Sequence, residues 1–297
     1  MGSAAIPTIF TDFATTMDGM LMASMDAVIS GGLASMRGQI ALALSLYIIG
    51  FAFLTIYGKT DVGTAALAAV RAVVVTQVLQ VSAYNFYVRD FFFTEAPNTI
   101  AAAMGGPRIT ISSAQQFDVL WSAALHATSI VLGQATGFTM MGERLVAWAL
   151  AGLMLVALGV IFLVWIIARV FMAVVICMGV FIILLFLFKA TRGFVEQWIG
   201  KLVGLIVLQL TSSILLRLVL VIIRDRMRAM GASPSGDVDA MIGQLASIAA
   251  VYWIAAALMI VLPTFIAIGS GVSAGSVIAG GALARFAGGA RRAARAT

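Results

Sequence analysis

The stretch of sequence that most constrains the fold runs from Leu145 to Phe188, a nearly unbroken hydrophobic run with a single charge at Arg169. Water cannot solvate such a run. A bilayer core about 30 Å thick takes roughly 20 apolar residues per helix, and helices satisfy every backbone polar group within the segment. The run therefore predicts either one long tilted helix or a hairpin of two short helices that turns at Arg169.

The composition extends this prediction to the whole chain. Apolar residues make up 62% of the sequence and charged residues only 10%, against about 25% charged residues in a soluble domain. We therefore expect an all-α, polytopic transmembrane protein with about five, or six, spans. The net charge of +6 could indicate nucleic acid binding. The basic residues flank the spans, however, which favours contact with anionic phospholipid headgroups.

The apolar runs and the polar segments between them divide the chain into five parts. These are an N-terminal amphipathic segment (1–37), a first transmembrane pair (38–83), a central loop with an amphipathic helix (84–143), a C-terminal transmembrane region (144–268) and a Gly/Ala/Arg-rich tail (269–297).

The N-terminal segment contains three aspartates and no Lys or Arg before Arg37, so it lacks the basic start of a signal peptide. Its apolar residues recur at helical spacing. One interpretation is a helix that docks on the membrane surface or on a partner protein, with Phe13, Met17 and Leu21 facing the contact. The other is a helix folded back on the chain's own bundle. Trp121, in the loop helix, is a further candidate for partner contact.

Three arginines fall within the predicted spans: Arg71, Arg169 and Arg217. Each would cost a few kcal/mol at the middle of a bilayer. Two interpretations remain open at this stage. The side chains either reach the headgroups or pair with a neighbouring helix, or they face a water-filled lumen.

Residues for catalysis are sparse. The sequence has no cluster of His, Cys, Asp and Glu at metal-ligand spacing and no glycine-rich phosphate loop. A catalytic triad would have to rely on the only histidine, His126. We therefore expect no enzymatic activity and no cofactor, only phospholipid contacts. A small-solute transporter or ion channel is the alternative function, although no carboxylate lies deep in a span, as a proton-coupled transporter usually requires.

One segment resembles a known family. From Gly179 to Leu202 an apolar span ends in phenylalanine, a Thr-Arg pair follows, and a tryptophan begins the next helix; the residues are Lys189, Thr191, Arg192, Trp198 and Gly200. The pair Leu262-Pro263 before a small-residue stretch, and Gln116-Phe117-Asp118 at a helix start, fit the same pattern. The sequence is similar to the TrbL-like family, the polytopic inner-membrane subunit of bacterial type IV secretion systems.

This resemblance implies a multi-pass protein of the bacterial inner membrane with a periplasmic N-terminus and central loop and a cytoplasmic tail. It also implies a homo-oligomeric base or channel for pilus biogenesis, conjugation and protein secretion. The implied partners are other inner-membrane and periplasmic subunits, a pilin or minor pilin and a secretion ATPase, with DNA only as transported cargo.

The resemblance also suggests roles for single residues. Trp198 would anchor a helix start at the cytoplasmic interface, and Lys189 and Arg192 would meet lipid phosphates or the ATPase. In the tail, Gly271 and Gly275 form a small-xxx-small pair. That pair either packs helices in the oligomer or belongs to a flexible tail.

Overall fold

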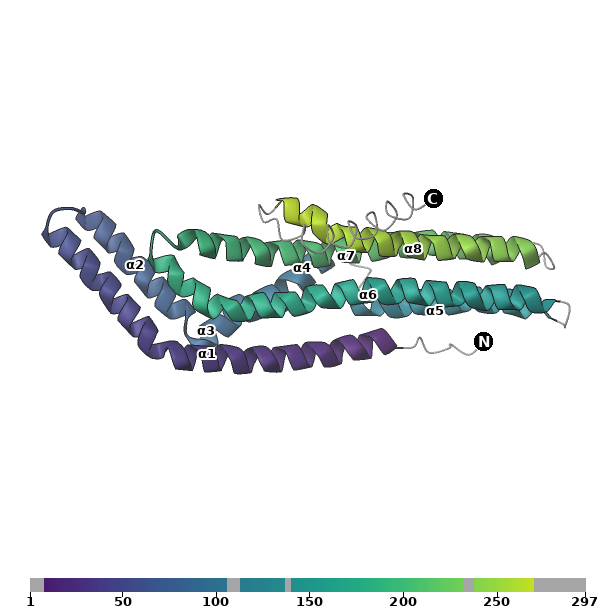
Figure 1. Cartoon of the computed structure of the whole chain (residues 1–297), viewed down its shortest axis with the longest axis horizontal. Coiled ribbons are helices and arrows are strands. Elements are labelled where there is room, and N and C mark those ends of the chain that lie inside the picture. Colours follow the sequence, from purple (N-terminus) through teal and green to yellow (C-terminus); the bar gives the residue numbers. More distant parts are fainter. Residues whose placement is uncertain (1–7, 106–112, 137–139, 232–237, 270–297) are drawn as a thin grey trace, which may run out of the picture. The chain divides into compact units, whose positions relative to one another are not determined.

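The computed structural model describes residues 8–105, 113–136, 140–231 and 238–269 (Figure 1). It is 94% helical and contains no strand in the described residues, which confirms the predicted all-α fold. The elements in chain order are α1 (Ile9–Ile56), α2 (Val62–Val78), α3 (Val81–Tyr84), the π-helix η1 (Asn85–Glu95), α4 (Ala96–Gly105), α5 (Ser113–Gln134), α6 (Met141–Leu184), the 3₁₀ turn η3 (Leu185–Leu187), α7 (Arg192–Gly231) and α8 (Val238–Gly269).

Four helical stretches of the described chain are long and apolar enough to cross a membrane. They are Ile9–Ile56, Met141–Leu187, Arg192–Met230 and Val238–Thr264. A fifth span arises if α2 and the bent segment Val81–Ile100 count together. These numbers agree with the prediction of about five spans. Helix α6 passes through Arg169 without a break, so the chain does not form a hairpin there.

The longest helices exceed the thickness of a bilayer. Helices α1, α6 and α7 contain 48, 44 and 40 residues, which at ~1.5 Å per residue corresponds to ~72, ~66 and ~60 Å. A bilayer core is only about 30 Å thick. Part of each helix must therefore lie outside the hydrocarbon, or the helix must tilt strongly.

Helix α1 joins two regions that the sequence analysis separates, the N-terminal segment 1–37 and the first predicted span. Its backbone is helical from Ile9 to Ile56 because only Gly38 weakens the helix at the predicted boundary, and one glycine costs about 1 kcal/mol relative to alanine. The helix ends at Ile56, and Gly58 in the following turn has a φ of 64°. The amide of Gly58 donates to the carbonyl of Thr55, and that of Lys59 to Leu54, which is the Schellman arrangement that glycine permits.

The described residues form two compact units, each with its own core. The first unit comprises Met1–Met17, Ala101–Ala168 and Val207–Thr297. Its core is lined by α5, the first part of α6, the last part of α7 and α8, with Phe117, Leu120, Ile161 and Tyr252 fully buried. The hydroxyl of Tyr252 donates to the carbonyl of Leu120 at 2.6 Å. The predicted amphipathic loop helix is thus present as α5, and its apolar face packs against its own chain.

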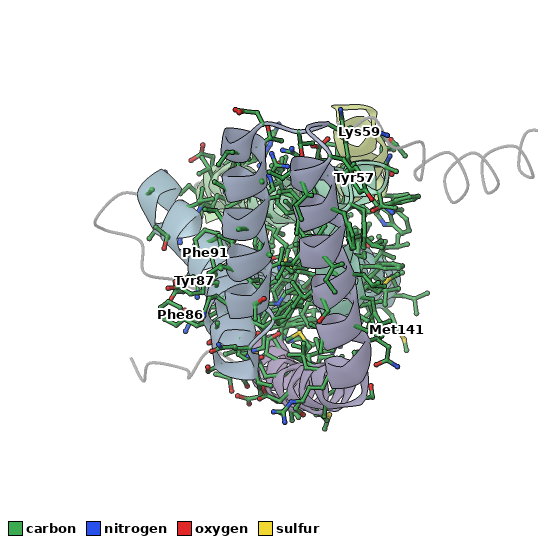
Figure 2. The ribbon with its side chains drawn as sticks, turned by 90° about the vertical axis from the view of Figure 1, so that its left-hand side faces the viewer. Tyr57, Lys59, Phe86, Tyr87, Phe91 and Met141 are labelled. Atoms are coloured by element: carbon green, nitrogen blue, oxygen red, sulfur yellow. The ribbon has the colours of Figure 1, made fainter. Side chains whose placement is uncertain are left out.

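The second unit comprises Asp18–Ile100 and Arg169–Ile206. In it, the end of α1 and helix α2 form an antiparallel pair joined by the turn that carries Tyr57 and Lys59 (Figures 1 and 2). Tyr84, Phe93, Met172 and Ile176 are among its fully buried side chains. Most of the residues singled out by the sequence analysis for function lie in this unit.

Candidate functional site

A buried cluster in the second unit holds helix α6 against its neighbours; we call it the α6 clasp. It consists of Tyr84, Gly179 and Trp198 together with the carbonyl groups of Val175 and Ile176. The indole Nε1–H of Trp198 donates to the carbonyl of Val175 at 2.7 Å. The hydroxyl of Tyr84 donates to the carbonyl of Ile176 at 2.5 Å. Each carbonyl has a second lone pair, so it can accept these bonds and still serve its own helix.

Gly179 makes the clasp possible. A Cβ atom built on it would lie closer than 3.0 Å to the ring of Trp198 and to the hydroxyl oxygen of Tyr84. Real Cβ atoms essentially never approach other atoms so closely. Gly179 lies one helical turn after Val175, so the missing side chain opens the space through which the indole reaches the Val175 carbonyl. The sequence analysis includes Gly179 in the family-like segment but does not predict this role.

The structure gives Trp198 a different environment from the predicted headgroup anchor. Its side chain is 6% exposed and its N–H is bonded to protein. An aromatic-belt tryptophan instead keeps its polar end at the wet side of the interface. The position of Trp198 is therefore set by packing inside the chain, and its importance for secretion stays a prediction.

The turn before α7 contains the other residues of the family-like segment. The hydroxyl of Thr191 donates to the carbonyls of Leu185 and Phe188 at 2.7 and 3.3 Å, which closes the turn. Arg192 pairs with Glu196 at 3.2 Å and lies over the ring of Phe186.

The other three residues of this motif set are Lys189, Gly200 and Pro263. The side chain of Lys189 is exposed, as contact with lipid or a partner requires. A Cβ built on Gly200 would meet nothing within 4 Å. Pro263 lies inside α8, which continues beyond it to Gly269.

Arg169, at the centre of the long hydrophobic run, pairs with another helix. Its guanidinium contacts the carboxylate of Asp18 in α1 at 2.5 Å and stacks on the ring of Phe93, 4.4 Å from the centroid. The arginine side chain is only 14% exposed. Of the two interpretations from the sequence, the structure therefore agrees with pairing to a neighbouring helix for Arg169.

A second charge pair lies further along α1. Arg89 contacts the carboxylate of Asp26 and that of Asp90 at 2.7 Å. The side-chain amide of Asn85 also donates to Asp26, at 3.1 Å. The sequence analysis allowed Arg169 to pair with a neighbouring helix but did not identify Asp18 or Asp26 as a partner. The available signal was the eight-residue spacing of Asp18 and Asp26, which places two acids on one face of a helix.

Asp118 in the first unit holds the beginning of α1. Its carboxylate accepts bonds from the amides of Phe10 and Thr11, at 2.8 and 3.0 Å, and from the hydroxyl of Thr11 at 2.5 Å. The first amides of a helix have no partner within the helix, and a carboxylate is favoured near its positive end. Asp118 therefore caps α1 from a distant part of the chain.

The contacts of the N-terminal segment separate its predicted docking residues into exposed and partly buried ones. Phe10 packs on Phe162 at a centroid distance of 4.7 Å and on Trp121 at 5.7 Å, which matches the interpretation of a helix folded onto its own chain. Phe13 is 50% exposed, whereas Met17, Leu21 and Trp121 are partly buried. The outward face that remains for a partner is therefore the one that carries Phe13.

The remaining candidate residues are the other two intramembrane arginines and the two tail glycines. Arg71 and Arg217 are partly buried, and the buried Nε atom of Arg217 has no acceptor within the described chain. Gly271 and Gly275 lie outside the described residues. In the portion of the chain that the structure describes, no three His, Cys, Asp or Glu residues are arranged to hold a metal ion.

Comparisons with known proteins agree with the resemblance seen in the sequence. A family model described as TrbL/VirB6 plasmid conjugal transfer protein matches residues 42–262. The type IV secretion system protein VirB6 of Bartonella quintana (strain Toulouse) is 28% identical over 193 residues, which is 63% of this chain and 58% of that protein. Protein VirB6 of Agrobacterium fabrum (strain C58 / ATCC 33970) is 26% identical over 213 residues, 69% of this chain and 70% of that protein. The match to the Bartonella protein thus spans little more than half of its length.

Proposed function

The chain belongs to the TrbL/VirB6 family of plasmid conjugal transfer proteins, and on this basis we propose that it is a non-enzymatic inner-membrane subunit of a type IV secretion system. In this role it forms an oligomeric base or channel on which a pilus or stalk assembles and through which DNA–protein or protein substrates pass. The observation that carries the proposal is the family match across residues 42–262. This range includes the last third of α1 and nearly all of the other candidate spans.

The geometry supports a subunit that meets partners on both sides of the membrane. Helices of ~60 Å or more exceed a bilayer core by about 30 Å, so parts of α1, α6 and α7 are free to reach proteins outside it. The exposed Phe13 side chain suits a periplasmic subunit or pilin. The exposed Lys189 side chain suits phospholipid phosphates or a cytoplasmic secretion ATPase. The charge pairs and the clasp hold the helices together and carry no chemistry of their own.

Deletion of the gene and complementation test the proposal. Plasmid transfer frequency and translocation of a reporter-fused effector are both measured in the deletion strain. We expect at least one of them to fall to background. The intact chain supplied in trans should restore the lost activity. Unchanged transfer in both assays, with uptake of a small solute by vesicles containing the purified protein, would instead support the transporter alternative.

Reporter fusions test the orientation that the proposal requires. Fusions after residue 100 should be active in the periplasm, and those after residues 195 and 290 in the cytoplasm. A periplasmic signal at residue 290 would contradict the arrangement of five spans with a cytoplasmic tail.

A further inference from the structure

The chain bends sharply after its second candidate membrane helix. Helix α2 has 17 residues and is therefore ~26 Å long, close to the ~30 Å of a bilayer core. It begins beside the turn that carries Lys59, so a crossing by α2 brings Val78 to the opposite headgroup region. The next helical segment, Val81–Ile100, makes an angle of 82° with α2.

This angle determines the direction in which the segment can run. At ~1.5 Å per residue, Val81–Ile100 is roughly 30 Å long, but its projection on the direction of α2 is only ~4 Å. The segment therefore adds almost nothing to the depth that α2 reaches. When α2 stands upright in the bilayer, Val81–Ile100 lies nearly parallel to the membrane surface, at the level where α2 ends.

The segment has an aromatic outer face. Phe86, Tyr87 and Phe91 are 59%, 63% and 45% exposed, and they project from the same side of the ribbon in Figure 2. Val88 and Phe93 are 6% and 1% exposed and face the protein. Both the outer pair, 86 and 91, and the inner pair, 88 and 93, are five residues apart, which is the hydrogen-bonding period of a π-helix.

Two of the three charged side chains of the segment, Arg89 and Asp90, are paired within the protein, and Glu95, beyond the three rings, is exposed. Arg89 is only 13% exposed and is bound by the carboxylates of Asp26 and Asp90. The outer face thus presents three rings, one of them with a phenolic hydroxyl. Aromatic side chains with a polar end concentrate at membrane–water interfaces, and an aromatic face that continues from the end of a membrane helix matches that environment.

We propose that Val81–Ile100 is an interfacial helix that lies in the plane of the bilayer, on the side opposite Lys59. Phe86, Tyr87 and Phe91 insert at the level of the headgroups and the upper acyl chains. The helix fixes the depth of α2 and, through Arg89 and Asp26, ties α1 to the membrane surface. This inference concerns the lipid contact of the purified chain and does not depend on its role in secretion.

Depth measurement by electron paramagnetic resonance tests the proposal. Cys177, the only cysteine, is replaced by alanine, and a nitroxide is attached to single cysteines at positions 86, 87 and 91. The protein is placed in nanodiscs of phosphatidylethanolamine and phosphatidylglycerol. Accessibility to oxygen and to a water-soluble nickel chelate gives the depth of each label. Matched controls are Val70, which is 61% exposed near the middle of α2, and the exposed Asp61 before it.

We expect the three labels to share one depth, between that of position 61 and that of position 70. Water accessibility equal to that of position 61 would show a segment in solution, and a depth equal to that of position 70 would show a re-entrant loop. Low accessibility to both reagents would show that a second copy or another protein covers the face. Each of these three results overturns the proposal.

A second measurement uses the unmodified chain, in case cysteine variants do not fold. A phospholipid with a photoreactive diazirine close to its headgroup should label peptides that contain Phe86 to Phe91. A lipid with the diazirine at the end of its acyl chain should label α2 instead. Absence of headgroup-level labelling at 86–91, with normal labelling of α2, contradicts the interfacial helix.

Discussion

Replacement of Gly179 by alanine tests whether the α6 clasp is as tight as its geometry indicates. The new Cβ would lie closer than 3.0 Å to the Trp198 ring and the Tyr84 hydroxyl oxygen. Neither group can move freely, because each is buried and donates a hydrogen bond to α6. The substitution must therefore shift a helix or break at least one of these bonds.

The expected free-energy change can be estimated from these terms. Overpacking of a core costs roughly 1–3 kcal/mol, and loss of a buried hydrogen bond adds about 1–2 kcal/mol. Alanine has an intrinsic helical advantage of ~1 kcal/mol over glycine, which reduces the total to about 1–4 kcal/mol of destabilisation. At roughly 2–4 °C per kcal/mol, the unfolding midpoint should fall by several degrees.

The matched controls are Gly200→Ala and Gly204→Ala in the neighbouring helix α7. A Cβ at either position meets nothing within 4 Å, so only the helical advantage remains and the midpoint should stay the same or rise. The assay is the monodisperse fraction of detergent-solubilised protein after heating, measured by size-exclusion chromatography. An unchanged or higher midpoint for Gly179→Ala would refute the clasp.

A double-mutant cycle separates the clash from general damage. Trp198→Phe removes the indole N–H and shrinks the ring, so Gly179→Ala should cost less in that background than in the wild type. Additive effects would mean that the two residues do not interact. If the clasp matters for function, transfer should fall in Gly179→Ala cells at growth temperature while the protein level stays normal.

Three other predictions concern α1. Asp18→Arg should destabilise the protein by about 1–3 kcal/mol, which is less than the loss of a fully buried ion pair would cost, because Asp18 is 35% exposed. Adding Arg169→Asp in the same chain should restore part of the unfolding midpoint, and no rescue by this double variant would contradict the pair. Asp118→Ala should cost about 1–2 kcal/mol through loss of the cap, measured as faster proteolysis of the N-terminal segment, and unchanged cleavage would argue against capping. Phe13→Asp should lower the unfolding midpoint only slightly, because the half-exposed ring loses one edge contact with Phe162, but it should abolish cross-linking to a periplasmic partner. Cross-links from position 13 only to this chain would reject partner docking.

The elements that follow from local hydrophobicity are those that the sequence predicts well. A continuous apolar run must satisfy its own backbone, so helical structure on both sides of Arg169 follows directly, although the sequence left a hairpin at Arg169 open. The helix at Ser113–Gln134 follows from the amphipathic spacing of its apolar residues. The bend between α2 and α3 is different. Leu79 and Gln80 stand at the break, and neither is a glycine or a proline, so no local signal marks it. Just after the bend, Tyr84 is fully buried and donates a hydrogen bond to the carbonyl of Ile176 in α6, a tertiary contact that no local pattern predicts.

Long-range polar contacts were equally beyond prediction from one sequence. Asp118 bonds with residues more than 100 positions away. The Trp198 indole bonds with a carbonyl, a group that every residue carries, so no residue type could point to it. The resemblance to a family marks Trp198 as a residue of interest, but only the structure distinguishes a buried donor from an interfacial anchor.

The charge pairs change the physical argument about the N-terminal segment. Three aspartates and no basic residue suggest a segment repelled by anionic lipid. In the structure, Asp18 and Asp26 are paired with Arg169 and Arg89, so much of that negative charge is compensated within the second unit. Electrostatic repulsion is then a weak reason to keep α1 away from a membrane surface. The stronger reason to expect a protein partner is the half-exposed Phe13 ring, which contacts Phe162 along one edge and shares its helix with the exposed side chains of Ile9 and Met20.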